Sequence, residues 1–274
     1  MNWNWRAIRA VIRKDLKQVL DNKMVWLPMV LVPAIIQVIL PFVLILLPSL
    51  VDPSELDIEE MGPLLQMLPP DLRGMLEGRS PTQLWIILSA NYMFAPMFLI
   101  VPLMVSSILG ADSFVGEKER KTLEALLYTP IRDGELFVAK VLTALLPALV
   151  ISIASFILYG IVVNASGYAT VGEIFFPTPS WWPLVFWLGP SVSVTGLGAT
   201  VLISSRARTF MQAQQFSGML VLPIVFLMIA QLTGLFFLSV RLLLLIGLFV
   251  WLVGVWLIWV GAKTFSRGAL ITRL

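Results

Sequence analysis

The chain has 274 residues, of which 58% are hydrophobic and only 13% are charged, with a net charge of +3 and a mean hydropathy of +0.91. A soluble domain is about half apolar and about a quarter charged, so this composition excludes a water-soluble core and favours lipid as the solvent. The absence of Cys and His excludes disulfides, thiolate and imidazole metal ligands, and the usual general base at neutral pH.

Residues 1–23 predict an amphipathic helix on the cytoplasmic side of a membrane. Apolar side chains recur at helical spacing from Trp5 to Val19, and basic side chains fill much of the remaining surface. A basic amphipathic helix lies in the membrane interface, and Trp3 also suits the headgroup region. Two interpretations stay open: a simple anchor, or an elbow helix that also contacts a cytoplasmic partner.

Six windows are long and apolar enough to cross a bilayer, since a spanning helix needs roughly 20 mostly apolar residues. They cover about residues 24–50, 84–110, 140–163, 183–204, 215–235 and 242–262. None of them contains Asp, Glu or Arg, and the only Lys is Lys140 at the edge of the third window. We therefore predict an all-α membrane protein with about six transmembrane helices in one transmembrane domain, residues 1–274.

Three of the windows carry specific expectations. Four prolines predict that the first span is bent or broken near its ends; they are Pro28, Pro33, Pro41 and Pro48. Only about residues 236–241 separate the fifth window from the sixth, so these windows predict either a tight hairpin or a segment with a re-entrant piece.

The basic residues are distributed unevenly between the two sides of the predicted spans. Of the 19 Lys and Arg residues, only Arg73, Arg79 and Arg241 fall on one side. Because cytoplasmic loops carry an excess of Lys and Arg, both termini are predicted to be cytoplasmic. The basic residues of the cytoplasmic side are Arg6, Arg9, Arg13, Lys14, Lys17, Lys23, Lys118, Arg120, Lys121, Arg132, Lys140, Arg206, Arg208, Lys263, Arg267 and Arg273.

Two connections are predicted on the opposite side. Residues 51–83 form an extracytoplasmic loop, in which we expect one or two short amphipathic helices, or a lid over a transport path. The loop of about residues 164–182 ends in Trp181 and Trp182, which predict an aromatic belt at the interface. Asn164 begins a three-residue match to a glycosylation sequon, which we interpret as accidental.

The connection between the second and third windows is too charged to span a membrane. Leu123, Leu126 and Leu127 nevertheless recur at helical spacing, and Glu117 and Lys121 form a favourable i, i+4 pair. Pro130 is predicted to end this helix. The pair Asp133-Gly134 marks a turn, after which a second helix runs from Glu135 into the third span.

The run Glu117 to Pro130, EKERKTLEALLYTP, followed by Glu135 and Ala139-Lys140, resembles the signature loop of ABC-2 type transporter permeases. Pro147 in the third window also fits that pattern, whereas Lys121 stands where the family usually has Gly. The six-span layout with a basic elbow extends the resemblance to the whole chain.

The resemblance implies a permease subunit of an ABC transporter, an exporter in the cell (plasma) membrane. It implies two ABC-type ATPase subunits as partners, together with a second copy of this chain or a homologous permease. Residues 111–139 would contribute a coupling helix that docks on the ATPase. The chain has no G-x-x-x-x-G-K-[ST] phosphate loop, so ATP and Mg²⁺ are expected in the partner, and this chain itself is expected to be no enzyme and to bind no cofactor.

The candidate site residues fall into two groups. The residues predicted to couple the chain to the ATPase are Glu117, Glu119, Arg120, Leu123, Glu124, Leu126, Leu127 and Pro130. Gln37 and Asn91 are candidates for the substrate path, because each stands in an apolar stretch, although polar residues in spans also serve interhelical hydrogen bonding. The uncharged interior favours a lipidic, amphipathic or peptide-like cargo, and we predict no catalytic residue, metal ligand or nucleic-acid partner.

Two alternatives use no ATPase. A secondary transporter or channel usually carries Asp, Glu or Arg inside its spans for ion coupling, and the six windows contain none. An intramembrane enzyme would lack most acid–base and metal chemistry in a chain without His or Cys. A neighbouring gene for a Walker-type ATPase would separate the permease from both alternatives.

Overall fold

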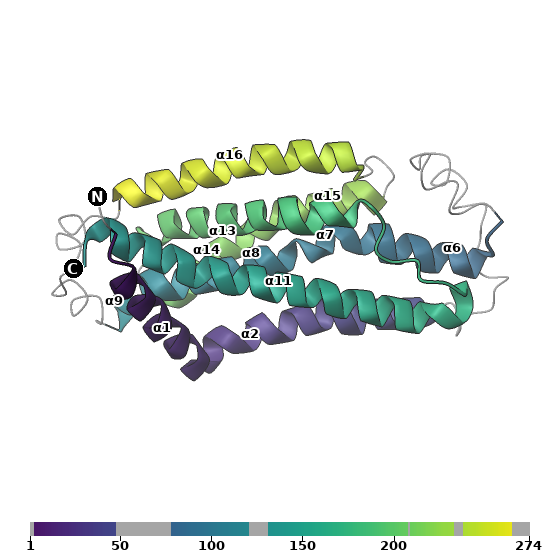
Figure 1. Ribbon diagram of the computed structural model, residues 1–274, viewed down its shortest axis with the longest axis horizontal. Helices are drawn as coiled ribbons and strands as arrows, with labels where there is room; N and C mark the ends of the chain where they lie inside the picture. Colours follow the sequence, from purple (N-terminus) through teal and green to yellow (C-terminus); the bar gives the residue numbers. More distant parts are fainter. Residues whose placement is uncertain (1–2, 48–77, 121–130, 208, 233–237, 265–274) are drawn as a thin grey trace.

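The computed structural model describes residues 3–47, 78–120, 131–207, 209–232 and 238–264. Within these ranges the chain forms helices and no strands, and most helices lie side by side along the long axis of the molecule (Figure 1). Six helical runs are long and apolar enough to cross a membrane, which confirms the predicted all-α membrane fold. These runs are Lys23–Leu46, Pro81–Glu119, Asp133–Val171, Trp181–Ser204, Phe210–Gln231 and Val240–Thr264, and we call them spans 1 to 6.

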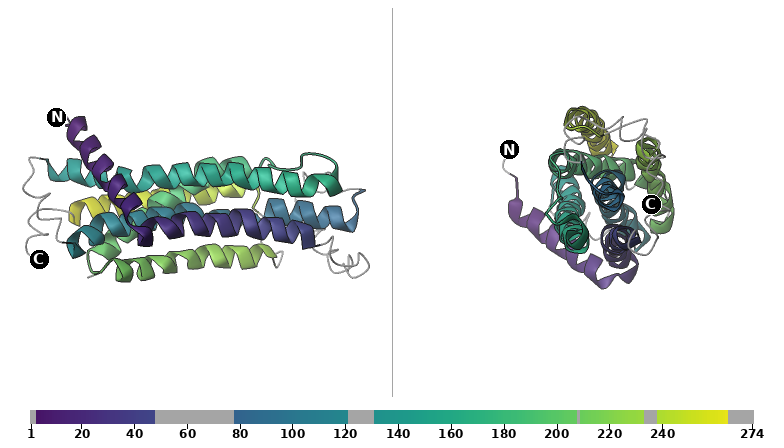
Figure 2. Two further views of the ribbon diagram at one scale, coloured as in Figure 1. Left: turned by 90° about the horizontal axis from the view of Figure 1, so that it is seen from below. Right: turned by 90° about the vertical axis from the view of Figure 1, so that its right-hand side faces the viewer.

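The amphipathic N-terminal segment folds as α1 (Trp5–Asp21), which lies across the bundle at an angle to the spans (Figure 2). Asn4 caps its start by accepting a hydrogen bond from the amide of Ala7 at 3.1 Å. Ile8 and Val19 are buried against the spans, whereas Trp5 is exposed. Asn22 ends α1 and also caps the next helix, so a single residue redirects the chain into span 1.

Span 1 consists of α2 (Lys23–Ala34), the π-helix η1 (Ile35–Ile39) and α3 (Leu40–Leu46). The irregularity of the described span lies in its middle, at η1, where the sequence predicted a bend or break near the ends. The end around Pro48 lies outside the described residues. Pro41 has no amide hydrogen to donate to the carbonyl of Gln37 four residues earlier, so the ordinary helical register fails here. The amide of Leu40 instead donates to Ile35, five residues back.

Span 2 is a nearly continuous run of 39 residues, which extends well beyond the predicted window. It comprises α6 (Pro81–Leu88), η4 (Ser89–Met93), α7 (Phe94–Phe98), α8 (Ile100–Ala111), η5 (Asp112–Gly116) and α9 (Glu117–Glu119). Such a run is about 58 Å long, against about 30 Å of bilayer hydrocarbon. Residues 111–119 therefore extend span 2 as a helix, whereas the sequence predicted a separate short helix from about Glu117, most of which lies outside the described residues.

Span 3 is the single helix α11 (Asp133–Val171), also of 39 residues. Asp133 and Gly134 form its first turn, where the sequence predicted a connecting turn, because a Glu135 carboxylate oxygen accepts from the amide of Arg132 at 3.1 Å. The helix also includes residues 164–171 of the predicted loop 164–182, and only residues 172–180 lie between it and span 4.

Spans 4 to 6 complete the bundle. Span 4 contains α12 (Trp181–Pro183), η6 (Leu184–Leu188) and α13 (Gly189–Ser204). Span 5 contains α14 (Phe210–Gly218), the 3₁₀ turn η7 (Met219–Val221) and α15 (Leu222–Leu232), and span 6 is α16 (Val240–Thr264). The fifth and sixth windows are thus two separate spans, and the re-entrant alternative is not seen in the described residues.

Small residues let α13 and α16 approach closely. A Cβ atom at Gly198 would lie 2.7 Å from Leu257 Cβ, and one at Gly254 would lie 2.7 Å from Thr195 Oγ1. The Thr195 hydroxyl donates to the carbonyl of Val250 at 2.9 Å across the same contact. This is how small and hydroxyl-bearing side chains commonly join helices in lipid.

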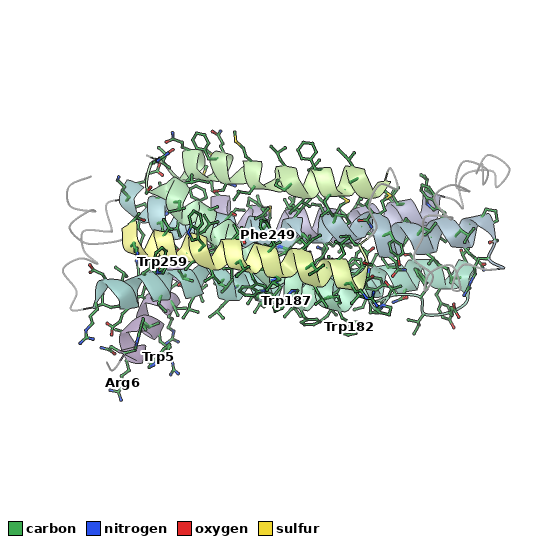
Figure 3. The ribbon with its side chains drawn as sticks, turned by 90° about the horizontal axis from the view of Figure 1, so that it is seen from above. Trp5, Arg6, Trp182, Trp187, Phe249 and Trp259 are labelled. Carbon is green, nitrogen blue, oxygen red and sulfur yellow. The ribbon has the colours of Figure 1, made fainter. Side chains whose placement is uncertain are left out.

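Large apolar side chains cover the outside of the bundle. Phe249 and Trp259 on span 6 and Trp182 on span 4 project away from the helices (Figure 3). Water would disfavour so much exposed apolar surface on a monomer, whereas bilayer hydrocarbon accommodates it. The exposed face therefore suits a lipid environment, as the composition predicted.

An aromatic cluster fills the end of the bundle opposite α1, which we call the aromatic end. Tyr159, Phe176 and Trp181 pack with ring centroids 4.7–5.1 Å apart. Trp181 is buried, so the predicted aromatic belt retains only Trp182 of the tryptophan pair at the surface. Asn164 holds the returning segment in place by donating to the carbonyl of Phe176 at 2.8 Å and accepting from its amide at 3.2 Å.

The same cluster satisfies the interrupted backbone of η4. Three consecutive carbonyls accept hydrogen bonds from side chains of three different spans: Ala90 from Tyr159 at 2.5 Å, Asn91 from Trp181 at 3.1 Å, and Tyr92 from Gln231 at 2.7 Å. Pro96 has no amide hydrogen to donate to the carbonyl of Tyr92 four residues earlier. Spans 3, 4 and 5 thereby converge on one turn of span 2.

Candidate coupling site

The charged side chains of the described residues concentrate where α1, the end of span 2 and the starts of spans 3 and 5 meet. We call this region the charged end; it lies at the left of Figure 1, around α1 and α9. The charges do not face outward only, because five of the described charged residues are buried. These five are Asp15, Asp112, Glu117, Glu135 and Lys140.

The centre of the charged end is the ion pair between Lys140 on span 3 and Glu117 on span 2. The Lys140 side chain is 0% exposed and that of Glu117 is 1% exposed. The Lys140 ammonium also donates to the carbonyl of Ser113 at 2.6 Å. A buried charge is tolerated only when it is paired and hydrogen-bonded, so each member of this pair requires the other.

The elbow helix α1 joins the same pair. Lys14 donates to the other carboxylate oxygen of Glu117 at 2.5 Å, so a single carboxylate bridges α1 and span 3. Burial lowers the pKa of Lys14, but the hydrogen bond and charge of Glu117 outweigh that effect and raise it above its usual value of 10.5. Lys14 is therefore a cation at neutral pH.

Asp15 lies beside this pair on the buried face of α1. Its Oδ1 is 3.1 Å from the Lys14 ammonium, in a geometry that makes no hydrogen bond. Burial raises the pKa of Asp15 above its usual value of 3.8, and the charge of Glu117 adds to the rise, while Lys140 and Lys14 oppose it. The group thus combines two lysines with two carboxylates; Lys140, Glu117 and Asp15 are buried, whereas Lys14 is exposed.

A second ion pair stiffens the end of span 2. Arg120 donates to Asp112 Oδ1 at 2.9 Å, across the turns of η5 and α9. The side-chain amide of Gln18 on α1 faces the same guanidinium. When its oxygen is assigned to that side, it accepts a hydrogen bond from Arg120 Nε at 2.9 Å. Arg120 therefore links α1 to span 2 at a second point.

Two carboxylates cap neighbouring helices at the charged end. A Glu119 oxygen accepts from the amide of Phe210 at 2.8 Å, at the first turn of α14 in span 5. A Glu135 oxygen accepts from the amide of Asn4 at 2.9 Å, just before α1 begins. Carboxylates suit helix N-termini because their first amides lack partners in the helix. Through these contacts α1 and spans 2, 3 and 5 form one connected group.

The structure places three of the predicted coupling residues. Glu117 is buried inside the chain, whereas Glu119 and Arg120 are exposed while making the contacts above. The i, i+4 partner Lys121 lies outside the described residues, as do the remaining five candidates. Those five are Leu123, Glu124, Leu126, Leu127 and Pro130.

Sequence reasoning did not identify Lys14, Asp15 and Asp112 as partners of these charges. A signal was present for Asp15, which falls on the apolar stripe of α1 between Ile8 and Val19 at helical spacing. An acidic residue in that stripe requires a cation opposite it once the helix packs. No comparable pattern marks Lys14 or Asp112.

The structure places the substrate-path candidates Gln37 and Asn91 in different cavities. Asn91 lines a small closed pocket at the aromatic end and donates to the carbonyl of Ile87 at 3.1 Å and that of Phe175 at 3.5 Å. Gln37 lines a groove between spans 1 and 3. Asn91 therefore already takes part in interhelical hydrogen bonding.

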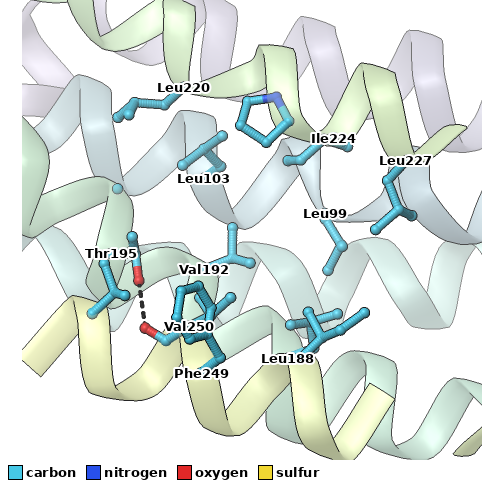
Figure 4. Close-up of a pocket in the computed structure, with 14 residues that line it drawn as sticks. Leu99, Leu103, Leu188, Val192, Thr195, Leu220, Ile224, Leu227, Phe249 and Val250 are labelled. Atoms are coloured by element: carbon cyan, nitrogen blue, oxygen red, sulfur yellow. Dashed lines mark hydrogen bonds between the residues drawn. The ribbon is translucent and has the colours of Figure 1, made fainter. Parts of the chain in front are cut away.

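A third cavity, of about 270 Å³, lies between spans 2, 4, 5 and 6 (Figure 4). Leucine, isoleucine, valine and phenylalanine side chains form most of its wall. Its hydroxyl group, on Thr195, already donates to the carbonyl of Val250 at 2.9 Å. This cavity offers hydrocarbon contact and no polar anchor.

Comparison with known proteins agrees with these features. A family model described as ABC-2 family transporter protein matches residues 9–240. No match was found among curated proteins or solved structures. The matched region includes most of α1, the whole of spans 1 to 5 and the charged end. The chain therefore belongs to the ABC-2 family, whose members are the membrane-spanning permease subunits of ABC transporters.

Proposed function

We propose that this permease is driven by a separate ATPase subunit, which docks on residues 111–139 and moves the spans through the charged end. One observation carries the proposal: the carboxylate of Glu117 is shared by Lys14 of α1 and Lys140 of span 3. A displacement of α9 cannot leave Lys140 behind without exposing a buried charge to an apolar environment. A force applied next to Glu117 would therefore reach α1 and span 3 together.

The contact of Glu119 with the first turn of α14 extends this path to span 5. Residues 121–130 follow directly after this region in the sequence, and their leucines at helical spacing supply an apolar ridge for a partner surface. We propose that the ridge docks on the ATPase and that Glu119 and Arg120 transmit the movement. In this arrangement Glu117 acts inside the permease and does not touch the partner.

The proposed assembly has two ATPase subunits and two permease subunits, the second permease being another copy of this chain or a homologue. ATP and Mg²⁺ bind in the ATPase subunits, and the permease performs no hydrolysis. Both termini and the charged end face the cytoplasm, in accord with the excess of basic residues there, and the membrane is the plasma membrane. Transport runs outward, and Gln37 and Asn91 lie on or near the path of a lipidic, amphipathic or peptide-like cargo.

The test is reconstitution of the chain in nanodiscs with the ATPase encoded by a neighbouring gene. ATP hydrolysis and co-elution are measured for the wild type, for Leu123→Ala and for Leu245→Ala, a matched control on the exposed face of span 6. Burial of a leucine is worth roughly 1.5–3 kcal/mol, so Leu123→Ala should weaken association about tenfold or more. The control should bind as the wild type does.

Two outcomes would refute this proposal. A wild-type chain that binds no such ATPase would remove it, and so would a Leu123→Ala variant with unchanged association and hydrolysis. If an ion gradient instead drove solute transport by the purified chain alone, the secondary-transporter alternative would replace this proposal. Topology is tested separately by single-cysteine labelling at Ser54, which is clean because the chain has no native Cys.

A further inference from the structure

A groove of about 230 Å³ runs between spans 1 and 3, away from the charged end. Val30, Pro33 and Gln37 line it from span 1, and Ile151, Ser155 and Leu158 line it from span 3. Val30 is 57% exposed and Leu158 is 51% exposed, so the groove opens on the outer surface of the bundle. That surface faces bilayer hydrocarbon, from which a ligand would enter sideways.

Gln37 distinguishes this groove, which Ser155 also lines, from the apolar cavity between spans 2, 4, 5 and 6. Its side chain is 2% exposed, and neither its amide nitrogen nor its amide oxygen has a hydrogen-bond partner among the described residues. In a membrane there is no water at this depth to satisfy the amide. A buried amide without partners disfavours the empty state and would favour any ligand that supplies one.

The backbone of span 1 keeps Gln37 in this buried position. The buried residues of the span recur at every fourth position: Val25, Met29, Pro33, Gln37, Pro41 and Ile45. In an ordinary α-helix with 3.6 residues per turn, such a series drifts by about 40° at each step. The wider π turn of η1 offsets part of the drift, and π turns of this kind often occur at functional sites.

The depth of Gln37 restricts the class of ligand. The residue lies 14 positions after Lys23, at the start of the span, which corresponds to about 21 Å along the helix. The hydrocarbon layer is about 30 Å thick, so the amide lies deep within it. Phospholipid headgroups remain at the interface, and the ligand must therefore bring its own polar group into the hydrocarbon layer.

We propose that the groove between spans 1 and 3 binds a small bilayer-soluble molecule that is mostly hydrocarbon and carries one hydroxyl or carbonyl group. The hydrocarbon part packs against Val30, Ile151 and Leu158, and the polar group exchanges a hydrogen bond with the amide of Gln37. The small volume of the groove favours a compact ligand. Binding requires neither ATP nor an ATPase, so the test of this site does not depend on whether the proposed coupling is correct.

The experiment uses two aliphatic diazirine photolabels of equal length, one ending in a hydroxyl and the other in a methyl group. The full chain in nanodiscs is labelled, and adducts are mapped by mass spectrometry in the wild type, in Gln37→Leu and in Gln215→Leu. Gln215 is an exposed glutamine on α14 and serves as the matched control. The hydroxyl label should modify residues 29–38 and 151–158 of the wild type and of the control.

In Gln37→Leu, labelling of these segments by the hydroxyl probe should fall about tenfold, because the hydrogen bond is lost. Labelling by the methyl probe should stay as in the wild type. The unliganded variant should also melt at a higher temperature than the wild type, because a leucine of similar size needs no hydrogen bond. Decanol should then raise the melting temperature of the wild type but not that of the variant.

The proposal is overturned if neither probe modifies the groove, or if Gln37→Leu leaves labelling by the hydroxyl probe unchanged. An equal loss of both probes would also overturn it, since the leucine would then have changed the shape of the groove. Gln37→Met is a second variant of similar volume. If both variants failed to fold, the amide would have a structural partner in the protein, and the proposed role would be wrong.

Discussion

At the charged end, ionised side chains join α1 to spans 2, 3 and 5, whereas at the aromatic end neutral donors join spans 3, 4 and 5 to the carbonyls of η4. The two ends differ in how their contacts depend on one another. Glu117 is shared by two lysines, so the loss of one group leaves others unpaired. At the aromatic end each carbonyl has its own donor, and the contacts are separable.

This difference suits different tasks. A group of mutually dependent charges moves as a unit, which is the property that the transmission of force from a docked partner requires. Separate hydrogen bonds to one turn of span 2 fix the positions of three spans, and these bonds do not depend on ionised side chains. We therefore expect the charged end to respond cooperatively to mutation, and the aromatic end to respond additively.

The largest effect is expected from breaking the central ion pair. Glu117→Leu should lower the free energy of unfolding by about 3–5 kcal/mol, because it leaves the buried Lys140 ammonium without its carboxylate partner. Lys140→Met should lower it less, because Lys14 still pairs with Glu117. The double variant should recover most of this loss, since well-packed apolar residues replace a buried pair at little cost. Thermal unfolding in detergent and the yield of folded protein measure both effects.

A double variant as unstable as the sum of the two single variants would contradict this account. The cause would then be lost packing around Phe114, which lies beneath the Lys140 ammonium at 5.8 Å, and not an unpaired charge. Glu117→Leu with Lys140→Met should also abolish ATPase stimulation while the protein stays folded. That result would separate the mechanical role of the pair from its role in stability.

A smaller effect is expected at the aromatic end. Tyr159→Phe removes the hydroxyl that donates to the carbonyl of Ala90 and should cost about 1–3 kcal/mol, because that buried carbonyl loses its partner. Gln231→Leu, which removes the donor to Tyr92, should cost a similar amount. The cost of the double variant should equal the sum of the two within about 0.5 kcal/mol, as for independent sites. A strong departure from additivity would mean that the aromatic end is as cooperative as the charged end.

Much of the fold was predictable because lipid imposes simple rules. Six apolar windows, the amphipathic segment around Trp5 and Val19, and the continuation of span 3 from Glu135 through Lys140 all follow from composition and helical periodicity. The boundaries were less predictable, since span 2 continues through Asp112 to Glu119. The partners that make these charges tolerable lie on α1 and span 3, distant in sequence.

The candidate site was less predictable than the fold. The motif pointed to Glu117, but its spacing suggested an exposed pair with Lys121 and gave no indication that the carboxylate turns inward to Lys140. The π turns at Gln37 and Asn91 were also missed, because local sequence patterns do not distinguish them from ordinary helical turns. Both features depend on how helices pack, and hydrophobic periodicity does not encode that packing.

A more modest effect is expected from the cap that links span 2 to span 5. Glu119→Ala removes the acceptor for the amide of Phe210 and should cost about 0.5–2 kcal/mol, as the loss of a helix cap does. Thr209→Ala, which removes the hydroxyl that accepts from Gln212 on the same helix, is the matched control for capping alone. Glu119→Ala should weaken ATPase stimulation more than Thr209→Ala does, at equal stability. Equal stimulation in the two variants would remove Glu119 from the coupling path.

The smallest expected effect concerns the pH dependence caused by Asp15. Burial, and then the charge of Glu117, raise the pKa of Asp15 in the folded chain above its value of 3.8 when unfolded. Between these two pKa values the folded state binds more protons than the unfolded state, so stability falls as the pH rises through this window. Lys14 does not contribute there, because its pKa is 10.5 in the unfolded chain and higher in the folded chain, far above this window. Asp15→Asn should therefore make the melting temperature depend less on pH above about pH 4.

The control for this prediction is Asp21→Asn, which changes an exposed carboxylate on the same helix. The melting temperatures of both variants and of the wild type are measured in detergent against pH. If Asp15→Asn and Asp21→Asn changed the slope equally, net charge would explain the effect. If the melting temperature of the wild type, relative to that of Asp15→Asn, instead rose with pH above 3.8, Lys14 and Lys140 together would outweigh the cost of burying the Asp15 carboxylate. In that case the four charges would stabilise the elbow helix in their ionised form, and the charged end would weaken in acid instead.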